Sequence, residues 1–299
     1  MPDTGRSVML FEGRKARYKP HIILQILIFM LVMLVSQLAA GMLAGVPIGI
    51  ALAGGGVETA MSGGMQSYLD YALDLMNNLP EWFSLVSLFL TAATTLLVLV
   101  YCRKLESRSY ASLGLTRRGF VKNYGIGFLV GAVMISAAAG LSVLLGGTEL
   151  RGLNGGVSYL FIALYFAGFL VQGMSEEVSF RGYLMVSCAN KVRAAAAVGI
   201  SSVIFAMFHL ANSGISPLAF VNLALFGVFA ALYVLRTDDL WGACAIHSAW
   251  NFFQGNIFGI SVSGAGVRSA LFGTRAISGR ELISGGTFGI EGGLCATAV

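Results

Sequence analysis

The sequence predicts an all-α protein, a polytopic transmembrane helical bundle of about seven spans. Three observations support this prediction: the composition, a succession of long apolar runs, and the charge between those runs. Of the 299 residues, 57% are hydrophobic and only 11% are charged, whereas soluble domains carry about 25% charged residues. So few charges cannot cover an ordinary water-facing surface, which excludes a soluble enzyme. Intrinsic disorder is excluded because it needs the opposite balance.

Seven apolar runs follow one another along the chain. Each suits a helix that crosses a hydrocarbon core of about 30 Å, which takes about 20 residues. The lipid bilayer is therefore the expected surrounding of the chain. We expect the spans at 22–53, 83–102, 123–146, 157–188, 194–212, 216–235 and 240–260.

Charge between the runs predicts the side that each loop faces. Residues 1–21 and 103–122 are basic, and 189–193 holds Lys191 and Arg193, whereas 54–82 has acidic residues and no Lys or Arg. By the positive-inside rule, the N-terminus is cytoplasmic in a multi-pass protein of the cell membrane. Because the positive charge marks topology, we expect no nucleic-acid partner.

These boundaries divide the chain into four parts. Residues 1–21 form a basic cytoplasmic N-terminus, 22–122 the N-terminal membrane spans with a basic loop, 123–260 a core, and 261–299 a Gly-rich tail. In the core, Gly127-Phe128-Leu129-Val130-Gly131 is a small-xxx-small pattern that favours close helix packing. The four cysteines form no CxxC pair, so they predict neither a disulfide framework nor a thiolate metal site.

One charged cluster lies inside an apolar run instead of at its end. Glu176, Glu177 and Arg181 fall within 157–188, where an ionisable group costs on the order of 2.5–3.5 kcal/mol at the bilayer centre. Glu177 and Arg181 are i,i+4 and can pair along a helix. Glu176 is turned about 100° away, has no cation on its own side, and is a candidate general base. The alternative is a buried ion pair that only locks two helices together.

Two of the three histidines also lie inside predicted spans. Counted from the basic loops at 1.5 Å per residue, Glu176 and His209 lie at about 22–24 Å, and His247 at about 16 Å with Asn251 one turn deeper. A lone buried histidine is usually a satisfied core residue. A carboxylate, two imidazoles and a carboxamide that converge in one wet cavity would be suited to hydrolysis.

In their order along the chain, these residues resemble the motifs of a known family, the CAAX-protease and bacteriocin-processing (CPBP, or Abi) intramembrane proteases. The resemblance covers about residues 110–295, including the tail segment from Ser284 to Glu291. The family motifs EExxxR, FxxxH and HxxxN correspond to Glu176, Glu177 and Arg181, to Phe205 and His209, and to His247 and Asn251.

The resemblance implies a peptide-bond hydrolase with its protease core at 123–260 and a cavity that reaches the bilayer interior from the cytosolic side. The substrate would be a peptide precursor or a membrane protein. In family terms, the attacking water is activated by Glu176 with His209, the oxyanion is stabilised by His247 and Asn251, and the site is oriented or the substrate bound by Glu177 and Arg181.

The participation of a metal is left open. Two histidines and one glutamate are a familiar zinc set with water as the fourth ligand, and here they would be Glu176, His209 and His247. These residues are not in HExxH spacing, and Asn251 is an unusual zinc companion. We slightly favour a metal-free mechanism over zinc.

Two other functions suit parts of the same pattern. A non-proteolytic scaffold or bacteriocin-immunity protein of the same fold would need no catalysis, but such proteins typically lose at least one motif residue. A transporter or proton relay would use the same buried groups, but no inverted repeat is evident.

The C-terminus departs from the family pattern. Family members commonly continue into a last hydrophobic helix, whereas here the chain stops at Val299, six residues into such a run. We expect the family-like eighth helix to be absent or truncated. The Gly- and Ser-rich tail is then expected to lie over the outer mouth of the bundle.

Overall fold

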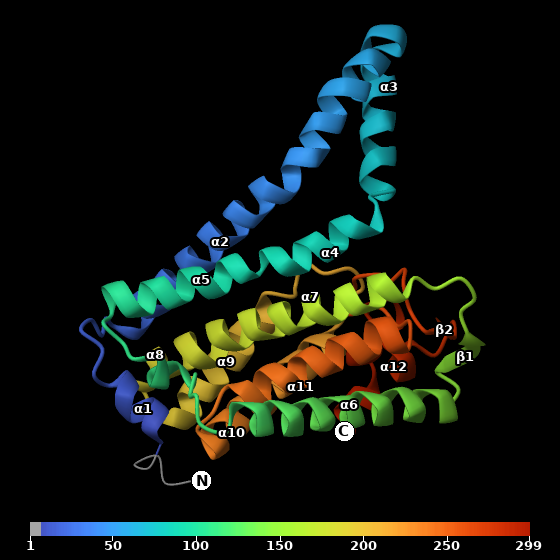
Figure 1. Ribbon diagram of the computed structural model, residues 1–299. Coiled ribbons are helices and arrows are strands. Elements are labelled where there is room, and N and C mark those ends of the chain that lie inside the picture. The colour runs from blue at the N-terminus through green and yellow to red at the C-terminus, as the bar shows by residue number, and fades with distance from the viewer. Residues whose placement is uncertain (1–6) are drawn as a thin grey trace.

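The computed structural model describes residues 7–299, most of which are helical (Figure 1). The segments labelled η are π-helical, except for three 3-10 turns (η3, η6 and η7). In chain order, the elements are α1 Val8–Gly13, α2 Ile22–Ala51, η1 Leu52–Gly56, α3 Val57–Asn77, α4 Glu81–Leu90, α5 Ala92–Val100, η2 Tyr101–Leu105, η3 Tyr110–Leu113, α6 Phe120–Leu144, β1 Thr148–Leu153, α7 Tyr159–Glu177, η4 Val178–Met185, α8 Val186–Ala189, α9 Ala194–Met207, α10 Pro217–Thr237, α11 Trp241–Phe252, η5 Phe253–Ile257, β2 Phe272–Ala276, α12 Glu281–Ser284, η6 Gly286–Phe288, η7 Ile290–Gly292 and α13 Leu294–Thr297.

All seven predicted spans form helices, which confirms the all-α membrane bundle. Within residues 7–299, five helical stretches are long and apolar enough to cross a membrane. The other two are shorter: α9 has 14 residues and α11 has 12. The predicted span 194–212 is too long because the chain leaves the helix after Met207 and turns at 208–211.

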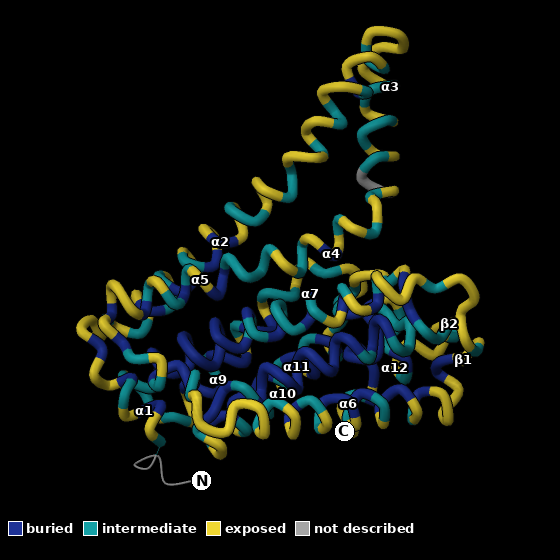
Figure 2. Tube along the Cα trace, viewed as in Figure 1, coloured by how far each residue is buried: buried dark blue, intermediate teal, exposed yellow. Residues whose placement is uncertain are grey.

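The acidic connection 54–82 is largely helical, because most of it is the helix α3. Figure 1 shows that α2 splays away from the bundle and that α3 returns to α4. Buried side chains of α2 come only from its first half, at Gln25, Phe29, Met33 and Ser36. The second half of α2 and most of α3 are exposed or only partly buried (Figure 2), and many of the exposed side chains of this arm are large and apolar.

Helix α11 lies at the centre of the bundle and is buried from Gly242 to Phe252. Glycines bring its neighbours close. A Cβ atom at Gly131 of α6 would lie 2.3 Å from the carbonyl oxygen of Ile246, and one at Gly173 of α7 would lie 2.5 Å from Oγ of Ser248. The small-xxx-small prediction for α6 is confirmed, and α7 approaches α11 in the same manner.

The two ends of the bundle differ. The first, called here the basic end, consists of residues 7–21, 101–122, 190–193 and 236–240, on the left of Figure 1. The second, called the distal end, consists of residues 52–82, 145–158, 208–216 and 258–299. Strand β1 pairs antiparallel with β2 at the distal end, so the connection between the predicted spans 123–146 and 157–188 contains a strand.

Packed side chains close the basic end. The Arg108 side chain is fully buried; its Nη1 donates to Oγ of Ser187 at 2.9 Å and its Nη2 donates to the carbonyl of Gly182 at 3.1 Å. The long loop at 101–122 is thereby fastened to η4 and α8. The apolar side chains beside this contact are at most 2% exposed; they include Leu113, Phe180, Tyr183, Leu184 and Leu240.

Candidate active site

The first motif lies where α7 changes into the π-helix η4. Glu176 and Glu177 are the last two residues of α7, and Arg181 lies in η4. Short π-helical segments occur frequently at functional sites. Oε1 of Glu177 accepts a hydrogen bond from Nη1 of Arg181 at 2.8 Å, and both side chains are fully buried. The predicted i,i+4 ion pair is confirmed.

The second motif supports the first. The ring of Phe205 lies against Arg181, with 4.5 Å between the guanidinium carbon and the ring centroid, which is within the range of a cation–π contact. The carbonyl oxygen of Phe205 lies 2.9 Å from Nδ1 of His209. With Nδ1 protonated and donating to this carbonyl, Nε2 of His209 is an acceptor. His209 lies in the turn after α9, not inside a span as predicted.

The third motif places an imidazole between two carboxylates. Nδ1 of His247 lies 2.9 Å from Oε1 of Glu177, and Nε2 lies 3.6 Å from Oε2 of Glu176. Counting residues from the basic loops put His247 at a different depth from Glu176, but the structure brings the two together. Glu177 therefore orients His247 as well as pairing with Arg181.

Gln172 links the remaining polar groups and was missed by the sequence analysis. Its Nε2 donates to Oε1 of Glu176 at 2.5 Å, and its Oε1 accepts from Nδ2 of Asn251 at 2.9 Å. A polar residue one turn before Glu176, in an otherwise apolar run, was the available signal. Gln172 fixes one oxygen of Glu176, while the other, Oε2, has no hydrogen-bond partner within residues 7–299.

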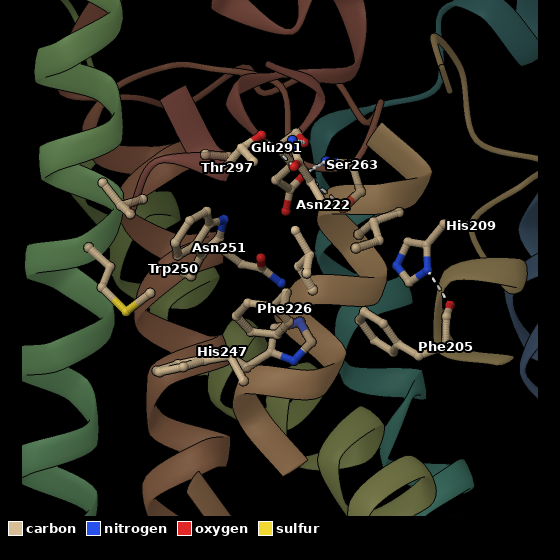
Figure 3. A pocket seen from close by; sticks show the side chains of 16 residues that line it. Phe205, His209, Asn222, Phe226, His247, Trp250, Asn251, Ser263, Glu291 and Thr297 are labelled. Atoms are coloured by element: carbon tan, nitrogen blue, oxygen red, sulfur yellow. Dashed lines mark hydrogen bonds between the residues drawn. The ribbon is translucent and has the colours of Figure 1, made fainter. Parts of the chain in front are cut away.

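Two cavities meet at these residues. The larger, of about 550 Å³, is lined by Gln172, Glu176, His209, His247 and Asn251 among others. The smaller, of about 140 Å³, shares His209, His247 and Asn251 with it. Figure 3 looks into the smaller cavity, whose other walls are largely apolar. All four predicted catalytic side chains thus line one connected space.

The C-terminal tail supplies a further acidic residue, Glu291, to the wall of the smaller cavity. The amide and Oγ of Ser263 both donate to its Oε2, at 2.7 and 2.9 Å. Burial raises the pKa of Glu291 above its ordinary value of 4.5, opposed by the Ser263 hydrogen bonds and by the charge of His209. The tail thus reaches the wall of the smaller cavity, and the sequence analysis did not assign Glu291 a role.

The predicted zinc set is not gathered into a ligand cluster. Within the described part of the chain, no three His, Cys, Asp or Glu side chains lie close enough together to hold one metal ion. Glu176 and His247 face each other, but His209 does not complete a three-ligand set with them. These side chains do not fit a resident zinc ion in this arrangement.

A comparison with protein families identifies the segment that contains all three motifs. Residues 158–253 match the family model for type II CAAX prenyl endopeptidase Rce1-like proteins, in agreement with the resemblance to CPBP proteases. No curated protein and no solved structure gives a significant match to the chain.

Proposed function

Residues 158–253 carry an Rce1-like CAAX-protease segment, and on this premise we propose that the chain is an intramembrane endopeptidase. It hydrolyses a peptide bond of a membrane-associated protein or a peptide precursor. The observation that supports this most directly is the pairing of Glu176 Oε2 with His247 Nε2, 3.6 Å apart, in a cavity that also contains His209 and Asn251.

In the proposed reaction, water binds between Glu176 and His209. Oε2 of Glu176 takes a proton from the water as its oxygen attacks the carbonyl carbon of the substrate. The C–N bond then breaks, and the proton passes to the leaving amine, which yields one carboxyl and one amino terminus. A positioned general base of this kind contributes about 10²–10⁴-fold to the rate.

His247 and Asn251 would stabilise the negative charge that develops on the substrate oxygen. As an imidazolium, His247 donates to Glu177 through Nδ1 and presents its Nε2 proton to the cavity. Asn251 uses one Nδ2 proton on Gln172 and has a second for the oxyanion. One such donor contributes on the order of 2.7–4 kcal/mol. Glu177 and Arg181 act by holding His247 in place.

We propose that Glu291 acts from the tail by fixing the part of the cavity wall that lies beside His209. Its anchor on Ser263 and its position in the same cavity wall support this role. Glu291 is therefore a positioning residue, which acts through the cavity wall rather than on the substrate.

The test is Glu176→Gln, assayed by mass spectrometry of cleavage products from membrane-associated peptide precursors. We expect a loss of kcat of about 10²–10⁴-fold with an unchanged amount of folded protein. Glu58→Gln, an identical change at an exposed residue of the arm, is the matched control and should be neutral. Cleavage that persists in both Glu176→Gln and His209→Ala would contradict the protease assignment.

The metal question has a separate test. We expect purified, active protein to contain no stoichiometric zinc and to retain cleavage after chelation. Inductively coupled plasma mass spectrometry and activity before and after chelation measure the two quantities. The metal-free mechanism would be contradicted if the protein contained one equivalent of zinc, if removing this zinc abolished cleavage, and if adding it back restored cleavage.

A further inference from the structure

The larger cavity opens toward one end of the bundle. Its wall is built by Ser84 and Ser87 of α4, by α7 from Tyr165 to Glu176, and by the loops 211–213 and 262–267. These segments belong to the distal end or to the parts of α4 and α7 next to it (Figure 1). Of the described residues, none in the basic end lines this cavity.

The opposite direction is blocked. After the two glutamates of the first motif, Phe180, Tyr183 and Leu184 are at most 2% exposed and pack into the main core cluster. Beyond them, Arg108 is fixed by Ser187 and Gly182. A substrate that approached from the basic end would have to displace both layers, so the site is reached from the distal end.

Charge distinguishes the two ends. The described residues of the basic end hold thirteen Lys and Arg against four Asp and Glu, whereas the distal end holds four against seven. Two of the four basic residues at the distal end, Arg151 and Arg275, lie 3.9 and 2.8 Å from the Glu149 carboxylate. The excess of Lys and Arg marks the cytoplasmic side of a membrane protein.

Together, these observations lead us to infer that the site takes its substrate from the extracytoplasmic side of the membrane. This differs from the cytosolic access that the family resemblance implies. The substrate class is then a polypeptide segment outside the cytoplasm or in the outer half of the bilayer. Its identity as a substrate rests on the proposed function, but the side of access does not.

Thiol labelling of full-length protein in the plasma membrane of intact cells tests the side of access. Ser213→Cys and Ser87→Cys place thiols at the mouth and in the wall of the cavity, and Lys191→Cys is the matched control at the basic end. The four native cysteines are at most 1% exposed, so the parent protein gives the background. The probe is a membrane-impermeant maleimide, applied before and after permeabilisation.

We expect Ser213→Cys and Ser87→Cys to react in intact cells and Lys191→Cys to react only after permeabilisation. Reaction of Lys191→Cys in intact cells, with the cavity thiols protected until permeabilisation, would overturn the assignment. If Ser87→Cys reacted under neither condition, the proposal that the larger cavity is open at the distal end would be wrong. Elution of each variant as one peak in detergent shows that it folds.

The labelling pattern is independent of catalysis. The same three cysteines in a Glu176→Gln background should give the same pattern, because the loops and the cavity mouth are unchanged. If the expected labelling pattern is observed but no assay detects cleavage, access from the extracytoplasmic side is supported and the protease function is contradicted. If cleavage is detected but the labelling pattern is reversed, the protease function is supported and access from the extracytoplasmic side is contradicted.

Discussion

At the scale of single residues, the site depends on one oxygen with two partners. Oε1 of Glu177 lies within hydrogen-bond distance of both Arg181 and His247. Nε and Nη2 of Arg181 have no hydrogen-bond partner within residues 7–299, so this guanidinium depends on Glu177 and on the ring of Phe205. The same carboxylate therefore balances a buried cation and orients the imidazole of His247, and these two roles can be separated by mutation.

The variant Glu177→Gln should lose both stability and activity. Removing one partner of a buried ion pair costs about 3–5 kcal/mol, because the other charge stays buried without compensation. The second change in Glu177→Gln/Arg181→Met removes that cation, so stability should largely return, whereas kcat stays low because His247 still lacks its carboxylate. Thermal unfolding in detergent and peptide cleavage measure the two effects. Recovery of kcat in the double variant would show that Glu177 serves stability alone.

Glu291→Gln should change how stability depends on pH. Because the pKa of Glu291 is raised in the folded protein, this carboxyl contributes to stability fully below pH 4.5. The contribution is lost as the pH rises through the raised pKa. The stability of Glu291→Gln relative to the parent protein should therefore increase as the pH rises from about 4 to about 7. Thermal unfolding in detergent measures this difference.

Glu281→Gln is the control for this experiment. The Gly279 amide lowers the pKa of Glu281, so its contribution is present above pH 4.5 and is lost as pH falls through the lowered value. The stability of Glu281→Gln relative to the parent protein should therefore decrease as the pH rises. The same trend in both variants would contradict the role of burial at Glu291.

At the scale of elements, glycines decide how closely the helices around α11 approach it. The contact of α6 with α11 at Gly131 and that of α7 at Gly173 leave no space for a methyl group. The distance from Glu177 to His247 depends on the second contact, because α7 and α11 carry these two residues. Helix packing and site geometry therefore respond to the same substitutions.

Gly131→Ala should destabilise the protein by about 1–3 kcal/mol, because the added methyl group overpacks a close helix contact. Gly140 lies in the same helix and has open space at its Cβ position, so Gly140→Ala should be neutral or slightly stabilising. Thermal unfolding of both variants in one detergent measures the difference. Equal stabilities would show that α6 can move away from α11 without cost.

The sequence predicted the elements that carry the site better than their exact form. Glu176, His209 and His247 could be found because polar groups are rare in apolar runs, where each needs a reason. Three features could not be predicted: the π-helix η4, the turn that holds His209, and the helix α3. The length of an apolar run does not specify where a helix changes its winding or where it ends. The contribution of Glu291 needed the folded tail, which returns to the bundle through long-range contacts.

At the scale of the whole molecule, the bundle is open at one end and sealed at the other. The membrane-bundle prediction followed from composition, because so few charges leave lipid as the only suitable surrounding. The family resemblance implies a cavity that is reached from the cytosolic side, but it carries no information on the charge of this chain's own loops. The end of the bundle toward which the larger cavity lies could be seen only in the folded chain. Orientation and access are properties of the assembled bundle.

Arg108→Ala should weaken the sealed end. The substitution leaves Glu106 and the carbonyl of Gly182 without their buried partner, which costs about 3–5 kcal/mol for a buried charge pair. Arg117→Ala, at an exposed arginine of the same loop, is the matched control. Limited proteolysis of the loop 101–122 and thermal unfolding measure the effect. Equal protease resistance in both variants would contradict the sealing role of Arg108.

The wide winding of η4 has a consequence for how this chain tolerates insertions and deletions. Eight residues from Val178 to Met185 follow the π pattern, in which each hydrogen bond encloses one residue more than in an α-helix. Deleting Val178, Ser179 or Phe180 would bring Arg181 one residue closer to Glu177 in the sequence and rotate it by about 100° relative to Glu177. Losing one of these three codons would thus disturb the first motif without altering any of its three charged residues.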